Sequence, residues 1–230
     1  MQNNSLKRIT QHLIIYSALL DNIGLMNGKM GVALFFYHLH KATKNDNHWA
    51  YANKLIEDIA SKLDYKIPRT FFDGLVGISW GLDHLIKNNF VALDDEHMLT
   101  ELDQALLEIN TTNLFDESFS TGVRGIAYYI VSRCSRKNNI PLPFCKDYIR
   151  VLYNRINRIE PKDPTTIHLL NQLRKIQNDN MIEYDLNPFY NLIGNEPYNN
   201  ENLFVQNRNI GIINNGYTGI ALRMLKIRES

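Results

Sequence analysis

The stretch Asn27-Gly28-Lys29-Met30-Gly31-Val32-Ala33 decides the fold, because three further segments of the chain repeat its pattern. The repeats are Asp73-Gly74-Leu75-Val76-Gly77-Ile78-Ser79, Thr121-Gly122-Val123-Arg124-Gly125-Ile126-Ala127 and Asn215-Gly216-Tyr217-Thr218-Gly219-Ile220-Ala221. Each has a polar residue, Gly, two variable positions, Gly, a β-branched aliphatic residue and a small residue. Four such GxxG turns with matching flanks indicate a repeated structural unit, whereas a single GxxG would be weak evidence.

The spacing of the turns predicts how many units the chain holds. Gly28, Gly74, Gly122 and Gly216 follow one another at intervals of 46, 48 and 94 residues. The last interval is almost twice the others, so we expect one further unit that has lost its glycines, at residues 164–178. About five units then fill the chain, which predicts a single domain over residues 1–230.

The segments after and between the turns read as two kinds of helix. Residues 32–37, which follow the first turn, are apolar on nearly every side, as in a helix that is buried all round. Residues 50–63 instead place apolar side chains on one stripe and charged ones opposite, as in a helix with one exposed face. No segment alternates with the two-residue period of a strand. The sequence predicts an all-α fold in which inner and outer helices alternate around a common axis.

Each turn should begin an inner helix. We expect Asn27, Asp73, Thr121 and Asn215, which precede the first glycines, to cap these helices by accepting a hydrogen bond from a free N–H. The glycines would permit unusual backbone angles and the close approach of a neighbouring backbone. The turns should therefore gather at one end of the helical array.

Composition and charge exclude several classes of protein. The chain has 25 Lys and Arg against 24 Asp and Glu, a formal charge of +1, which argues against binding nucleic acid through a basic surface. No apolar run approaches the roughly 20 residues that a membrane span requires. The N-terminus lacks the pattern of a secretion signal, and two cysteines are too few for a disulfide framework. We therefore expect a cytoplasmic protein.

Residues 24–35, 72–81 and 214–221 resemble the corresponding turns of lanthionine synthetase C-like proteins. The resemblance implies an α/α toroid whose inner helices each begin with a GxxG turn. The family typically has seven helical hairpins, whereas this chain has room for about five. It therefore implies a shortened toroid, an open crescent or one part of a larger assembly, with repeat turns at 27–33, 73–79, 121–127 and 215–221.

The family's enzymes cyclise peptides with a zinc ion that is held by two Cys and one His. The Cys-His pair directly before a repeat glycine corresponds here to Asn214 and Asn215, and the other Cys to Phe72 or Ser120. None of these side chains can replace a zinc thiolate. We therefore predict no metal site, no cofactor and no zinc-dependent cyclase activity.

Three carboxylates at the turns are the candidates for other chemistry. Asp73, Asp116 and Glu117 would lie at the end where a pocket should open, and toroids can host sugar chemistry that uses two acids. The simpler interpretations are a helix cap for Asp73 and a solvated loop for the other two.

Several residues are candidates for binding. Lys29 and Arg124 are charged residues inside turns and could contact an anionic group near the helix N-termini, with surface placement as the commoner alternative. Asn214 and Asn215 occupy the altered metal positions. The segment 180–214 breaks the helical pattern and carries aromatic side chains, and its Tyr190 and Tyr198 could pack over one end of the fold or contact a partner.

The remaining reactive side chains have structural interpretations. His38 and His84 occupy the same repeat position, well down the expected inner helices, and we expect histidines of the core or of the far rim rather than ligands or bases. Cys134 and Cys145 are expected to be ordinary structural cysteines.

The leading hypothesis is a catalytically degenerate relative of the cyclases that binds a peptide substrate or a modification enzyme. The alternative is a carboxylate-dependent hydrolase or lyase acting on a sugar or a peptide. A third is a purely structural interaction module, and a homo-oligomer is left open.

Overall fold

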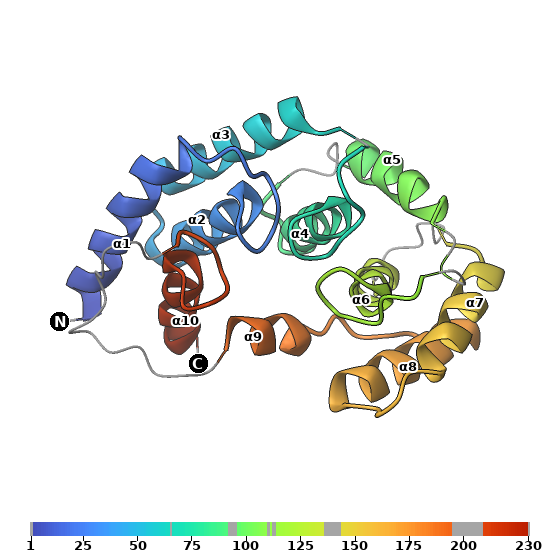
Figure 1. Cartoon of the computed structure of the whole chain (residues 1–230). Coiled ribbons are helices and arrows are strands. Elements are labelled where there is room, and N and C mark those ends of the chain that lie inside the picture. The colour runs from blue at the N-terminus through green and yellow to red at the C-terminus, as the bar shows by residue number, and fades with distance from the viewer. Residues whose placement is uncertain are drawn as a thin grey trace. The chain divides into compact units, whose positions relative to one another are not determined.

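The computed structural model describes residues 2–64, 66–91, 96–109, 111, 114–135, 144–194 and 209–229. In this part of the chain the regular structure consists of ten α-helices and no strand (Figure 1). The all-α fold that the periodicity predicted is therefore confirmed. None of the helices in the described ranges combines the length and the apolar character that crossing a membrane would require.

The helices belong to two compact units. Unit 1 combines Met1–Asp64 with Leu186–Ser230 and holds α1 (Gln2–Ser17), α2 (Lys29–Thr43), α3 (Asp46–Lys62), α9 (Asn187–Ile193) and α10 (Tyr217–Glu229). Unit 2 is Tyr65–Asp185 and holds α4 (Leu75–Lys87), α5 (Glu96–Leu107), α6 (Val123–Cys134), α7 (Lys146–Asn157) and α8 (Pro164–Gln177). The single-domain organisation over residues 1–230 stays a prediction.

The burial pattern separates two kinds of helix, as the periodicity predicted. Every residue of α4 from Leu75 to Ile86 is buried, and α2 and α6 are buried on nearly every side. In contrast, α3 and α7 each bury a single stripe at helical spacing, consisting of Ala52, Leu55 and Ile59 in α3 and of Ile149, Leu152 and Ile156 in α7. In unit 1, α2 packs against α3 and α10; in unit 2, α4 and α6 pack together, with α5 against α4 (Figure 1).

A helix occupies residues 164–177, where we expected a sequence repeat that has lost its glycines. Here α8 spans Pro164–Gln177 and packs against α6 and α7. Its start uses a different device, because the Asp163 side chain accepts a hydrogen bond from the Thr166 N–H at 2.7 Å and Pro164 fills the first turn. An aspartate cap thus begins this helix, whereas a GxxG turn begins the helix of each of the other four repeats.

Part of the segment 180–214 forms a helix, which the sequence did not predict. Its residues 187–193 form α9, which buries Phe189 and Ile193 and packs against α10. Asn187-Pro188 supplies the start of this helix, a signal that the irregular composition around it obscured. Residues 195–208, including Tyr198, lie outside the described residues, so the role expected for Tyr198 stays a prediction.

Candidate functional site

Each GxxG turn forms one corner together with the loop before it. The four corners are residues 22–31 at the start of α2, 68–77 at the start of α4, 116–125 at the start of α6 and 209–219 at the start of α10. In each corner the residue after the first glycine donates its backbone N–H to a carbonyl at the start of the loop. The four bonds are Lys29 N to Asn22 O (2.9 Å), Leu75 N to Pro68 O (3.0 Å), Val123 N to Asp116 O (3.0 Å) and Tyr217 N to Asn209 O (3.0 Å). The loop thereby satisfies helical N–H groups that would otherwise lack a partner.

The capping residue differs from the expectation. The N-cap residues of α2, α4 and α6 are the glycines Gly28, Gly74 and Gly122, so Asn27, Asp73 and Thr121 lie one position before the cap. The prediction that these polar residues occupy the N-cap position is therefore wrong. Backbone carbonyls of the wrapped loop, which sequence periodicity does not reveal, bond the first-turn N–H groups instead.

Close packing explains why both positions of the third turn are glycine. A Cβ on Gly122 would lie 2.3 Å from the Asp116 carbonyl oxygen, and a Cβ on Gly125 would lie 2.3 Å from the Phe119 carbonyl oxygen. The φ of Gly122 is −107°, which any residue can adopt. The glycines are thus required for the approach of the loop and not, as also expected, for unusual backbone angles.

Two corners lie side by side within each unit. In unit 2, the N–H groups of Phe71 and Phe72 both donate to the Ser120 carbonyl at 3.0 Å. In unit 1, the Ile212 N–H donates to the Met26 carbonyl at 2.6 Å. Met26 and Ser120 both precede the first glycine of their turn by two residues, so the corners pair in the same way in both units.

A comparison with known protein families identifies this arrangement. Residues 20–166, more than half of the chain, match the family described as lanthionine synthetase C-like protein. The chain belongs to the lanthionine synthetase C-like family. No curated protein matches the chain in a direct sequence comparison. The match spans the first three of the four corners.

The residues at the family's zinc positions do not fit zinc. Phe72 and Ser120 offer a phenyl ring and a hydroxyl group, and Asn214 and Asn215 offer amides, whereas zinc in proteins takes thiolates, imidazoles and carboxylates. Asn214 and Asn215 are exposed and have φ values of 55° and 54°. The Asn215 side-chain oxygen accepts a hydrogen bond from Arg223 at 2.9 Å. Across the described ranges, no three or more His, Cys, Asp or Glu side chains gather as a metal site would require.

The two charged residues inside the turns are engaged within their own units. Lys29 is only 4% exposed and forms an ion pair with Asp58 on α3. The hydrogen bond from Lys29 is the largest effect that lowers the pKa of the Asp58 carboxyl group. Arg124 pairs with Asp163 and donates from Nε to the Glu117 carbonyl at 2.6 Å. Lys29 joins the start of α2 to α3, and Arg124 joins the start of α6 to the residues before α6 and α8; binding of an anion by either stays a prediction.

The carboxylates at the third corner are also held by neighbours. Asp116 accepts hydrogen bonds from the Thr121 hydroxyl group and from the Ser118 N–H, and these bonds lower the pKa of its carboxyl group. Glu117 forms an ion pair with Arg155 at 3.0 Å. A general acid needs a raised pKa, so the environment of Asp116 favours a structural role. A catalytic role for Asp73, Asp116 or Glu117 stays a prediction.

One signal at the corners was not recognised in the sequence. Asn22, Asp116 and Asn209 each accept a hydrogen bond with the side-chain oxygen from the N–H two residues later, at 2.8, 2.8 and 2.5 Å. These Asx turns start the loops whose carbonyls accept hydrogen bonds from the first turns of α2, α6 and α10. An Asn or Asp six or seven residues before the first glycine would have identified them.

The other candidates lie in structural settings. Tyr190 is half-buried on α9 beside Phe189. His84 is buried, stacks on Trp80 and shares a hydrogen bond of 2.6 Å between its Nδ1 and the Tyr184 hydroxyl oxygen. Burial lowers the pKa of His38 to about 4.

The two cysteines differ in exposure. Burial raises the pKa of the Cys134 thiol to about 12, which leaves it protonated and unreactive at neutral pH. Cys145 is exposed at the start of α7. Both cysteines are free thiols in this structure, and Cys134 fits the expected structural role.

A buried charge cluster in unit 2 was not anticipated from the sequence. Lys87 and Asp83, one turn apart on α4, form an ion pair of 2.6 Å, and the Ser132 hydroxyl group of α6 donates to Asp83 at 2.8 Å. Beside them, Arg133 donates from Nε to Asp103 of α5 at 2.8 Å. We call these five residues the α4–α6 charge cluster. A Lys four residues after an Asp in an otherwise apolar helix is the sequence signal that could have indicated it.

Proposed function

We propose that this lanthionine synthetase C-like chain is a non-catalytic component of peptide modification, which binds the peptide or the enzyme that modifies it. One observation carries the proposal. The corners keep their glycines and their loop-to-helix hydrogen bonds, whereas the positions that correspond to the zinc ligands of the family's enzymes carry Asn214, Asn215 and either Phe72 or Ser120.

Chemistry explains why the loss of the ligands matters. Cyclisation adds a cysteine thiolate to a dehydrated Ser or Thr, and zinc promotes the step by ionising the thiol. A free cysteine has a pKa of about 8.5 and is mostly protonated at neutral pH. Without a group that lowers this pKa, the chain should leave the thiol of a bound peptide unreacted.

The altered corner still suits peptide recognition. Asn214 and Asn215 are exposed, and each amide carries both donors and an acceptor, as a peptide backbone does. These groups could form hydrogen bonds with an extended peptide without any metal.

Two measurements test the proposal. The zinc content of protein purified without a metal column should lie far below one ion per chain, and stoichiometric zinc would overturn the proposal. A linear fluorescent peptide with one Cys and one dehydroalanine should raise fluorescence anisotropy on binding. Because cyclisation leaves the mass unchanged, the free thiol is then counted by trapping with N-ethylmaleimide. We expect the same free-thiol fraction with and without protein, and an accelerated loss would show catalysis.

A matched pair of variants locates the peptide. Asn214→Ala should weaken peptide binding, whereas Asn89→Ala should not. Both asparagines are exposed and adopt positive φ, 55° and 56°, so the two substitutions carry similar backbone strain. Equal effects of the two variants on peptide binding would contradict a site at this corner.

A further inference from the structure

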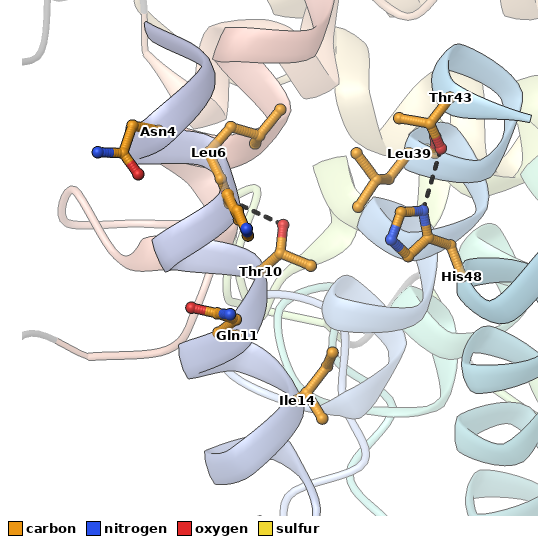
Figure 2. Close-up of a pocket in the computed structure, with 9 residues that line it drawn as sticks. Asn4, Leu6, Thr10, Gln11, Ile14, Leu39, Thr43 and His48 are labelled. Atoms are coloured by element: carbon orange, nitrogen blue, oxygen red, sulfur yellow. Dashed lines mark hydrogen bonds between the residues drawn. The ribbon is translucent and has the colours of Figure 1, made fainter. Parts of the chain in front are cut away.

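A cavity of about 510 Å³ lies in unit 1 between α1 and the pair formed by α2 and α3 (Figure 2). Its walls include Leu6, Thr10 and Ile14 of α1, Leu39 and Thr43 of α2, and His48 of α3. The volume is within the range of small-molecule sites. Because α1 precedes the residues that match the family, 20–166, the cavity depends on a helix outside that match.

Six of the nine described residues that line the cavity carry polar groups. The other three form an apolar surface, in which Leu6 and Leu39 are 4% and 3% exposed and Ile14 is exposed. Such a surface favours a ligand with an apolar body, because binding removes apolar area from water. The polar groups then decide which ligands are accepted.

The contacts of Thr43 favour one tautomer of His48. The Thr43 hydroxyl oxygen lies 2.7 Å from the Leu39 carbonyl oxygen, which can only accept, and 3.0 Å from His48 Nδ1. With the hydroxyl proton directed to the Leu39 carbonyl, we assign the ring proton to Nδ1, which leaves a lone pair on Nε2. Burial, with a contribution from the neighbouring His40, lowers the pKa of His48 and keeps the ring neutral at pH 7. Nε2 points toward α1 across the cavity (Figure 2).

The opposite wall offers a second acceptor. Thr10 on α1 donates its hydroxyl proton to the Leu6 carbonyl at 2.8 Å, which leaves the lone pairs of its oxygen as acceptors. The described residues that line the cavity include Lys7 but no carboxylate, so a cation would find no counter-charge. The cavity is therefore complementary to a neutral hydrogen-bond donor on an apolar body.

We propose that this cavity binds a small neutral molecule with an apolar ring and one N–H or O–H group, which donates a hydrogen bond to Nε2 of His48. Thr43 is a positioning residue, because its hydroxyl group keeps the proton on Nδ1. The site is independent of the corners and of the function proposed for them.

Indole and 1-methylindole form a matched pair of probes, since the second lacks the N–H donor. Titrations at pH 7.5 are followed by NMR, with the methyl signals of Leu39 and Thr43 and the ring signals of His48 as reporters. We expect saturable binding of indole in the millimolar range. The dissociation constant of 1-methylindole should be about fivefold higher, as expected for one lost hydrogen bond.

Three variants separate recognition from size. His48→Phe keeps a ring and removes the acceptor, so the two probes should then bind with similar affinity. Thr43→Val keeps the shape of the side chain but frees the tautomer, and should also reduce the discrimination. His40→Phe makes the same change at a histidine that does not line the cavity, and should leave the discrimination intact.

The outcomes are decisive in both directions. Discrimination that persists in His48→Phe would result from the extra methyl group and would overturn the proposal. No saturable binding of indole, or equal binding of both probes to the unaltered protein, would overturn it as well. If His48→Phe does not fold, which circular dichroism shows, Thr43→Val and His40→Phe provide the same comparison.

Discussion

Replacing Lys87 by Met should strongly destabilise unit 2. The Asp83 side chain is fully buried, and its ion pair with Lys87 is 2.6 Å long. Met keeps most of the apolar stem of Lys but removes the charge, so Asp83 would remain as a buried carboxylate without its closest cation. Removing one partner of a buried ion pair typically costs 3–5 kcal/mol of unfolding free energy.

The surroundings of Asp83 place this variant near the lower end of that range. The Ser132 hydroxyl group stays 2.8 Å from Asp83, and the Arg133 guanidinium group lies 3.9 Å away. The charge of Arg133 is shared with Asp103, to which its Nε donates at 2.8 Å. We therefore expect a loss of about 3 kcal/mol.

Urea unfolding of a Trp49→Phe background measures this loss, because the buried Trp80 of α4 is then the fluorescent reporter. The double variant Asp83→Asn with Lys87→Met is the decisive control. It contains no buried unpaired charge and should regain about 2 kcal/mol relative to Lys87→Met alone. A single variant that loses less than about 1 kcal/mol, or a double variant that is less stable than the single one, would refute the reasoning.

Three further predictions concern the corners and the helices they begin. Gly125→Ala should lower the unfolding free energy by about 2–3 kcal/mol in urea titrations, although Ala is normally the better helix former, because its Cβ would lie 2.3 Å from a carbonyl oxygen. Asp58→Asn should lower the unfolding free energy by about 1–2 kcal/mol at pH 7, because it leaves the buried Lys29 without a carboxylate. Below about pH 4 the difference from wild type should shrink, because Asp58, whose pKa is lowered in the folded chain, stabilises the fold only while it is ionised. The pKa of His38 is about 4 in the folded chain and about 6.5 in the unfolded chain. Protonation of the unfolded state should therefore lower the unfolding free energy of the wild type by about 2 kcal/mol between pH 7 and pH 5, and His38→Gln should abolish this loss. An unchanged pH dependence in that variant would contradict the buried neutral state of His38.

The sequence predicted the features of the fold that depend on local pattern. Helical periodicity separated α4, which is buried throughout, from α7, which buries only Ile149, Leu152 and Ile156. The glycine spacing also predicted a unit at residues 164–178, where α8 lies. These features could be predicted because the spacing of apolar residues over a few turns indicates which face of a helix is buried.

Features that depend on distant segments could not be predicted in this way. The bond from the Val123 N–H to the Asp116 carbonyl requires the loop to fold back over the helix. Both atoms belong to the backbone, which is the same for nearly all residue types, so the side-chain pattern does not indicate this bond. The contact of Arg133 with Asp103 joins residues that are 30 positions apart. Likewise, the cavity beside His48 exists only because α1 packs near α2 and α3.

The corners also explain how the glycine motif of the family can persist while the residues before it vary. Their shape depends on glycines and on backbone carbonyls, so the two positions before the first glycine can vary without breaking any of the loop-to-helix bonds. In the fourth corner the loop is one residue longer, and Asn214 and Asn215 both adopt positive φ. Asparagine tolerates this conformation better than Cys, so the two amides suit the backbone of this corner. A GxxG pattern therefore identifies the scaffold, and only the residues before it identify the reaction.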